Sequence, residues 1–290
     1  MHESMMASVG IYRFHSDRWG SGKGERLPLL LLHGFMGCGD DFEAVVRCLE
    51  PPIQGDRPSG NIYALDLPGH GQTRLADPTQ LTAYGMPATA QGVRDWTQHI
   101  QPGPWAIAGY SMGGRLALYL ATHFPDVFPV TVAIAASPGL AEEGDRQKRK
   151  ELDHHRALTL EACKTNEQFE QFLERWYQMP LFSHLATHPN FESMLTRRRR
   201  NHPQWLAHSL RYLGLGQQPF LTPALARYPG QLHLVVGEHD RKFIALNQAI
   251  ARQCPRAQLT IIPNSGHTIP LETPTALAQV LANALTAAAT

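Results

Sequence analysis

Six short apolar runs, separated by stretches with helical periodicity, constrain the fold of this chain more than any other feature. The runs cover residues 27–34, 61–69, 104–110, 130–139, 231–240 and 257–267. Apolar spacing of the helical type predicts helices near residues 87–100, 112–123, 243–253 and 272–286. Buried strands that alternate with helices are typical of a parallel sheet covered on both faces. The sequence therefore predicts an α/β fold.

Residues 139–228 have a different character, because they are polar, highly charged and contain no strand-like run. Phe169, Phe172, Leu173 and Trp176 follow an i, i+3, i+4, i+7 pattern, which predicts an amphipathic helix. We expect a helical cap here, inserted between two parts of an α/β core at residues 1–138 and 229–290. Such a cap would cover the carboxyl ends of the strands, where open α/β sheets bind ligands.

Charge and composition exclude several classes of partner and compartment. The 290 residues carry a formal net charge of only +1, so no global field attracts nucleic acid. No apolar run is long enough to span a membrane, and the N-terminus lacks the pattern of a signal peptide. The four cysteines form no CxxC pair and no zinc-like spacing, which favours free thiols in a reducing compartment. We expect a cytoplasmic protein without a metal site.

The segment GYSMG, from Gly109 to Gly113, follows an apolar run and opens a helical pattern. This strand–turn–helix context is typical of a nucleophile elbow, in which glycines permit a sharp turn that exposes the serine. Ser111 is therefore the candidate nucleophile or base. The alternative is a chance match to a short pattern.

A serine hydroxyl needs a base, and the elbow order predicts an acid followed by a histidine. Asp240 ends the apolar run of "VVGEHD", and His267 ends that of "PNSGH". We expect His267 to accept the proton of Ser111 and Asp240 to fix the histidine tautomer. Glu238 and His239 are nearby competitors for the acid position.

The loop HGFMG, which follows the first apolar run, predicts an oxyanion hole. The backbone N–H groups of Phe35 and Met112 would converge on a developing negative oxygen. His33 and Gly34 are interpreted as residues that shape the turn, and His70 as a structural residue of the loop "DLPGHGQT".

These motifs resemble those of the α/β-hydrolase superfamily: "LLHGF", "DLPGHG", "GYSMGGR", "GEHD" and "SGH" span nearly the whole chain. A closer resemblance is to the 2-succinyl-6-hydroxy-2,4-cyclohexadiene-1-carboxylate synthases of menaquinone and phylloquinone biosynthesis. It rests on "LHGFMGCGDDF", "SPGLAEEGDRQKR", "WYQMPLF" and "NHPQWLAHSLRYLGLGQQPFL", so it includes the cap.

The resemblance implies a lyase reaction on a small polycarboxylate that bears an enolpyruvyl ether and a succinyl side chain. Ser111 would remove a proton next to the succinyl ketone, and pyruvate would be expelled. The oxyanion hole would hold the enolate. No metal or organic cofactor is implied.

Arg115 lies four residues after Ser111, so both side chains are expected on one helix face. A guanidinium matches a carboxylate bidentately, and the implied substrate has three carboxylates. We interpret Arg115 as a substrate ligand. The alternative is a structural salt bridge to an Asp or Glu.

Further pocket residues follow from the resemblance. Arg149 in "GDRQKR" fits a substrate-binding position, with Arg146 as its competitor. Arg198 fits a second position, with a doubt of one residue inside the run 197–200. Trp176 and Tyr110 match pocket aromatics, although each could instead be a packing residue.

Two other functions use the same residues. A carboxylesterase, thioesterase or carbon–carbon bond hydrolase would form an acyl-enzyme on Ser111, but a neutral ester needs no cationic pocket. A ligand receptor would retain the fold without turnover. An aspartate nucleophile, needed for dehalogenase or epoxide-hydrolase chemistry, is absent from the elbow.

Overall fold

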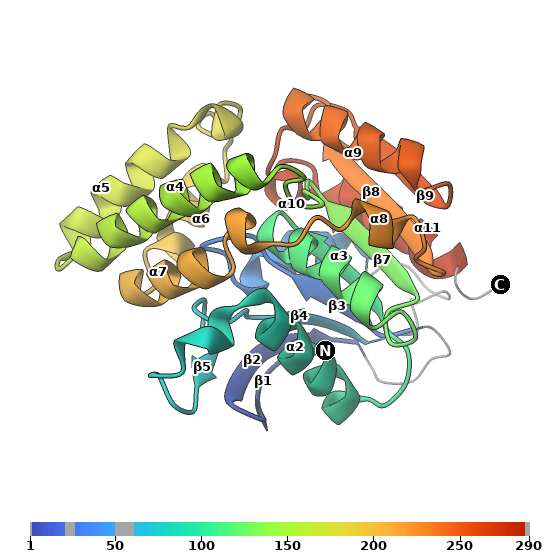
Figure 1. The fold of residues 1–290 in the computed structure, drawn as a ribbon, viewed down its shortest axis with the longest axis horizontal. Coiled ribbons are helices and arrows are strands. Elements are labelled where there is room, and N and C mark those ends of the chain that lie inside the picture. Colours follow the sequence, from blue (N-terminus) through green and yellow to red (C-terminus); the bar gives the residue numbers. More distant parts are fainter. Residues whose placement is uncertain (1, 21–26, 50–60, 288–290) are drawn as a thin grey trace.

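The computed structural model describes residues 2–20, 27–49 and 61–287, and within them it confirms the α/β fold (Figure 1). Neighbouring strands of the sheet follow the order β1-β2-β4-β3-β6-β7-β8-β9, and β5 pairs with β2. Pairing from β4 through to β9 is parallel. The strands are β1 (His2–Val9), β2 (Tyr12–Trp19), β3 (Leu29–Leu32), β4 (Ile62–Leu65), β5 (Arg74–Leu75), β6 (Ala106–Tyr110), β7 (Val130–Ile134), β8 (Gln231–Gly237) and β9 (Ala257–Ile262).

The antiparallel hairpin of β1 and β2 is not among the expected strands. Strand β1 exposes most of its side chains, and its sequence lacks the kind of apolar run that predicts the parallel strands. Strand β2 buries the polar residues His15, Ser16 and Asp17. Burial of His15 is possible because its ring bonds Asp66, at 2.8 Å. Hydrogen bonds to distant residues therefore allow polar side chains to be buried in a strand that also buries aromatic side chains.

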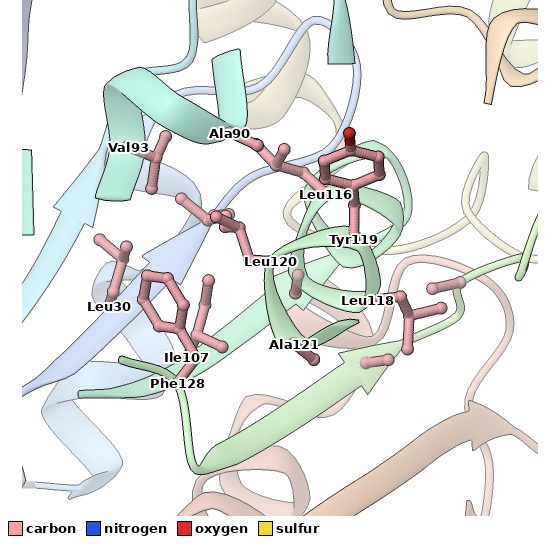
Figure 2. Packing of buried hydrophobic residues seen from close by; sticks show 14 of the residues in the cluster. Leu30, Ala90, Val93, Ile107, Leu116, Leu118, Tyr119, Leu120, Ala121 and Phe128 are labelled. Carbon is pink, nitrogen blue, oxygen red and sulfur yellow. The ribbon is translucent and has the colours of Figure 1, made fainter. Parts of the chain in front are cut away.

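Helices cover both faces of the sheet, as expected. One face carries α1 (Glu43–Leu49), α10 (Ile269–Glu272) and α11 (Pro274–Ala287), and the other carries α2 (Met86–Ile100), α3 (Met112–His123) and α9 (Arg241–Gln253). Figure 2 shows Leu116 and Leu120 of α3 packed among residues of α2 and of the central strands. Helix α3 is apolar around most of its circumference, which is typical of a helix buried on several sides. Each buried leucine contributes about 1.5–3 kcal/mol, so the start of α3 is firmly placed.

Residues 139–228 contain helices and no strand, as expected (Figure 1). The helix predicted from Phe169 to Trp176 is α5, and Thr165 begins it with a capping box to Gln168. The cap has its own apolar cluster, which also takes in Met36 of the core. The exact division into core and cap remains a prediction. The helices are α4 (Glu143–Ala162), α5 (Asn166–Tyr177), α6 (Phe191–Arg198), α7 (Pro203–Tyr212) and α8 (Thr222–Leu225), with 3₁₀ turns at Pro180–Phe182 and Leu215–Gln217.

Candidate active site

Ser111 occupies a strained turn between β6 and α3. Its φ angle is +52°, a region that residues with a side chain rarely adopt. A Cβ atom on Gly109 would overlap the backbone of Gly113, and one on Gly113 would overlap the carbonyl of Leu32. Only glycines fit at both positions, which explains the GxSxG pattern. The turn places the Ser111 hydroxyl at the start of α3, facing a cavity.

Ser111, His267 and Asp240 form one hydrogen-bonded chain. The His267 Nε2 atom lies 3.2 Å from Ser111 Oγ, and Nδ1 lies 2.6 Å from Asp240 Oδ2. Asp240 also accepts a bond from the N–H of Phe243 and so begins α9. Of the competing residues, Glu238 instead accepts the N–H of Asn264. The arrangement can draw the proton from a serine hydroxyl and stabilise the resulting imidazolium.

Aromatic rings surround the His267 imidazole. The ring centroids of Phe243, Tyr110 and Phe182 lie 4.7, 5.6 and 6.1 Å from it. Phe182 belongs to the cap, whereas Phe243 and Tyr110 belong to the core. Because His267 is 3% exposed, these rings leave the imidazole little contact with water. A base in such a site acts on the bound substrate more readily than on solvent.

The HGFMG loop is held against the elbow. His33 donates from Nδ1 to the Gly34 carbonyl at 2.7 Å, and its Nε2 accepts the N–H of Leu67 at 2.9 Å. Burial lowers the pKa of His33, so the ring is neutral and shapes the turn. A Cβ on Gly34 would come within 2.7 Å of the Tyr110 ring, so glycine permits this close approach.

Phe35 and Met112 both line the cavity beside Ser111. Met112 is the first residue of α3, where a backbone N–H has no partner within the helix. Neither residue donates its N–H in the loop and cap hydrogen bonds found among the described residues. Two backbone donors are therefore available to a negative oxygen.

The cavity between the sheet edge and the cap has a volume of about 680 Å³. All ten of the expected site residues line this one cavity. Arg146 is not among the lining residues. The ten are Ser111, Asp240, His267, Phe35, Met112, Arg115, Arg149, Arg198, Tyr110 and Trp176.

Among the described residues, the Arg115 side chain bonds neutral groups only. Its guanidinium donates to the carbonyl of Leu213 at 2.8 Å and to Gln218 Oε1 at 3.2 Å. Within residues 2–20, 27–49 and 61–287, no carboxylate forms an ion pair with it. The acidic partner that the alternative interpretation requires is therefore missing there. Burial, followed by the charge of Arg149, lowers the pKa of Arg115 to about 10, so it stays charged at neutral pH.

Arg149 reaches the cavity from α4, whereas Arg146 turns back to the carbonyls of Leu140 and Ala141. The Nε atom of Arg149 lies 2.9 Å from both carboxylate oxygens of Asp153. The sequence analysis missed Asp153, although its i, i+4 spacing to Arg149 was a usable signal.

Arg198 is 4% exposed and is already paired. Its guanidinium contacts Asp41 at 2.7 and 2.9 Å, and its Nε donates to the Tyr177 hydroxyl at 3.1 Å. Burial acts to lower the pKa of Arg198, but Asp41 outweighs it and raises the value. No local pattern pointed to Asp41, because it lies in the 3₁₀ turn Gly39–Phe42 of the core, 157 residues earlier.

Trp176 and Tyr110 differ in their surroundings. Trp176 is half-buried in the cavity wall, 5.1 Å from the Phe35 ring between centroids. Tyr110 is buried, and its hydroxyl donates to Thr268 Oγ1 at 3.4 Å. Burial raises the pKa of Tyr110 strongly, so the phenol is neutral. Tyr110 thus both packs under the loop at Gly34 and lines the cavity.

The described residues contain no group of three His, Cys, Asp or Glu side chains placed to hold a metal ion. None of their helices combines the length and the hydropathy needed to cross a lipid bilayer.

Comparisons with known proteins agree with the fold. Residues 29–280 match the alpha/beta hydrolase family. The structure is similar to that of MenH from S. aureus, with a TM-score of 0.84 and 24% identity, covering 96% of this chain and 99% of that one.

The relatives found by sequence point to a narrower family than the fold does. A 2-succinyl-6-hydroxy-2,4-cyclohexadiene-1-carboxylate synthase from Enterobacter sp. is 32% identical over 257 residues, which cover 89% of this chain and 91% of that protein. The chloroplast protein PHYLLO of Arabidopsis thaliana is 30% identical over 84% of this chain, which spans only 14% of that longer protein. The chain belongs to the alpha/beta hydrolase family and, within it, to the family of 2-succinyl-6-hydroxy-2,4-cyclohexadiene-1-carboxylate synthases.

Proposed function

We propose that this chain eliminates pyruvate from 2-succinyl-5-enolpyruvyl-6-hydroxy-3-cyclohexene-1-carboxylate, a step in menaquinone or phylloquinone biosynthesis. The observation that carries the proposal is the meeting of two features in one cavity. A serine–histidine–aspartate chain faces Arg115, a cation without a carboxylate partner among the described residues. An unpaired buried charge is costly, so a cavity that retains one suits an anionic ligand.

The triad supplies the base. His267 takes the proton of Ser111, and the serine oxygen then removes the proton from the ring carbon next to the succinyl ketone. The electrons of that C–H bond form a new ring double bond, the existing double bond shifts, and the bond to the enolpyruvyl oxygen breaks. Enolpyruvate leaves and takes up a proton to become pyruvate. The ring is left as a 2,4-diene.

The oxyanion hole stabilises the charge that forms on the ketone oxygen. The N–H groups of Phe35 and Met112 are the donors in this proposal, and they need no rearrangement during the reaction. No water enters the balance of the elimination, which suits a base enclosed by Tyr110, Phe182 and Phe243. The proposed reaction requires no metal and no organic cofactor.

The arginines bind the carboxylates. Arg115 and Arg149 face the cavity from α3 and α4, and Arg198 faces it from α6. Guanidinium groups bind carboxylates with two parallel hydrogen bonds, worth about 1.5–3 kcal/mol each when charged. Trp176 and Tyr110 provide apolar walls for the ring. The ligand is thus a small polycarboxylate.

The test supplies the purified chain with the enolpyruvyl substrate and follows pyruvate with a coupled dehydrogenase. We expect release far above the spontaneous rate, and loss of that release in Ser111→Ala. Release at only the spontaneous rate, together with fast cleavage of simple esters by the wild type, would show a hydrolase instead. Binding without turnover in the wild type would show a receptor.

A further inference from the structure

One face of helix α4 looks into the cavity. Arg149, Leu152 and Arg156 follow an i, i+3, i+7 pattern, and all three line the cavity wall. Arg149 was expected there, but Arg156 belongs to none of the motifs described above. Helix α4 therefore contributes two arginines to the cavity wall.

Arg156 is held in place by uncharged neighbours. Its Cζ atom lies 5.1 Å from the centre of the Trp176 ring, and its Nη2 atom donates to Met179 Sδ at 3.2 Å. The side chain is 25% exposed, so most of it is removed from water. The indole supports the guanidinium from one side, and among the described residues the bond to Met179 is the only hydrogen bond that the Arg156 side chain donates.

The nearest carboxylate does not neutralise Arg156. Both oxygens of Asp153 lie 2.9 Å from Arg149 Nε, whereas Arg156 Nη1 is 3.8 Å from the nearer oxygen. One negative charge thus serves two arginines and is committed mainly to Arg149. By contrast, Arg198 has a close ion pair with Asp41, with contacts of 2.7 and 2.9 Å. Of these cap arginines, Arg156 has the least compensated charge.

We propose that Arg156 is a substrate-binding residue that receives one carboxylate of the polycarboxylate ligand, and that Asp153 positions Arg149 and Arg156 side by side. This inference rests on the proposed function. It assigns a larger share of carboxylate binding to Arg156 than to Arg198, whose charge Asp41 already balances.

The first experiment compares wild type with Arg156→Met, which keeps an apolar stem over Trp176 but removes the charge. KM for the enolpyruvyl substrate rises at least tenfold, kcat stays within threefold, and the melting temperature is unchanged. Arg156→Lys recovers part of the affinity, since it restores the charge without the planar fork. The matched control is Arg175→Met, because Arg175 is an exposed arginine of α5 that does not line the cavity.

A KM for Arg156→Met within twofold of wild type would overturn the inference. So would an equal rise in the Arg175→Met control, because the effect would then reflect only the general charge of the cap. Calorimetric titration with tricarballylate, a simple tricarboxylate, separates this inference from the proposed function. Binding that weakens in Arg156→Met supports the inference even if the wild type releases no pyruvate, and binding that does not weaken contradicts it.

Asp153 is tested as a positioning residue with Asp153→Asn. We expect KM to rise while kcat is kept, because both arginines lose their common anchor. Asp153→Glu recovers part of the affinity, which a purely structural role would not predict if both variants melt at the same temperature. Loss of thermal stability with an unchanged KM would show that Asp153 only supports the fold of α4.

Discussion

The two sides of the cavity are built in different ways. On the core side, the reacting groups are fixed by backbone: the φ of Ser111, the first N–H of α3 and the turn at Gly34. On the cap side, long side chains face the cavity and are held by pairs such as Arg149 with Asp153. In the proposed function, the core side determines the chemistry, and the cap side determines which molecule is bound.

This difference predicts that substitutions on the two sides change different kinetic parameters. Groups that act only in the transition state change kcat, whereas groups that hold the substrate throughout change KM. We expect core substitutions to lower kcat and cap substitutions to raise KM. Asp41 tests the boundary, because it belongs to the core but pairs with Arg198 of the cap.

The largest expected effect is on the core side. Ser111→Ala removes the proposed base, and kcat should fall about 10⁴-fold, the upper range for a positioned acid–base group. Substrate affinity, measured by calorimetry, should stay within threefold of wild type. A kcat within tenfold of wild type would mean that the chemistry does not depend on Ser111.

The second largest effect is expected when the ion pair between Asp41 of the core and Arg198 of the cap is removed. Asp41→Asn leaves the buried Arg198 without a carboxylate, which typically costs about 3–5 kcal/mol of unfolding free energy. Urea unfolding at pH 7 measures this loss. The matched control is Asp40→Asn, because Asp40 is an exposed neighbour that forms no ion pair among the described residues.

The cost of Asp41→Asn should depend on pH. Burial acts to raise the pKa of Asp41, but Arg198 outweighs it and holds the value below the ordinary one. A lowered pKa gives stability that is present above the unfolded value, about 3.9, and is lost as pH falls through the folded value. The difference between wild type and variant should therefore shrink below about pH 4. A constant difference from pH 7 to pH 3 would contradict this account.

The third effect concerns Arg115, which lies on the core helix α3 but is proposed to bind substrate, so it tests whether a core residue can affect KM. Arg115→Ala should raise KM at least tenfold, in line with about 1.5–3 kcal/mol for a charged hydrogen bond. Arg74→Ala is the control, since Arg74 also donates to backbone carbonyls but lies outside the cavity wall. Unchanged kinetics with a lower melting temperature would assign Arg115 a structural role.

The smallest effect concerns the aromatic wall of the cap. Trp176→Leu removes the ring under Arg156 and should raise KM about threefold to tenfold, since such a contact is worth about 0.5–2 kcal/mol. Trp205→Leu is the matched control, because Trp205 carries Arg74 over its ring away from the cavity. Equal KM values for Trp176→Leu and wild type would show that Trp176 only packs the cap helix.

The sequence predicts most of the core side. The run 104–110, the elbow and α3 follow from local rules, because apolar periodicity and glycine positions act over a few residues. The apolar runs overestimate the strands, however: the run 130–139 is a strand only to Ile134, and Ala135 then turns with a φ of +47°. The turns after β7, β8 and β9 lie at the same edge of the sheet as Ser111, so part of the excess length of these runs belongs to loops of the candidate site.

The sequence predicts the cap side less completely, because its interactions join distant segments. Asp41 pairs with Arg198, and Gln218 orients Arg115, over separations of 157 and 103 residues. No periodicity connects such positions. Arg156 and Asp153 are closer in sequence, but their spacing is also typical of an ordinary exposed helix. The strand β2 was missed for a related reason, since buried His15 depends on Asp66.

The proposed oxyanion hole has a consequence for how such proteins acquire new reactions. Its donors are peptide N–H groups of Phe35 and Met112, which every non-proline residue possesses. Most single amino-acid exchanges at these positions therefore keep the donors, provided that the path of the chain survives. The cap and its arginines can then change during evolution while the catalytic groups of the core are kept. A lineage can therefore acquire a new substrate and retain the same reaction mechanism.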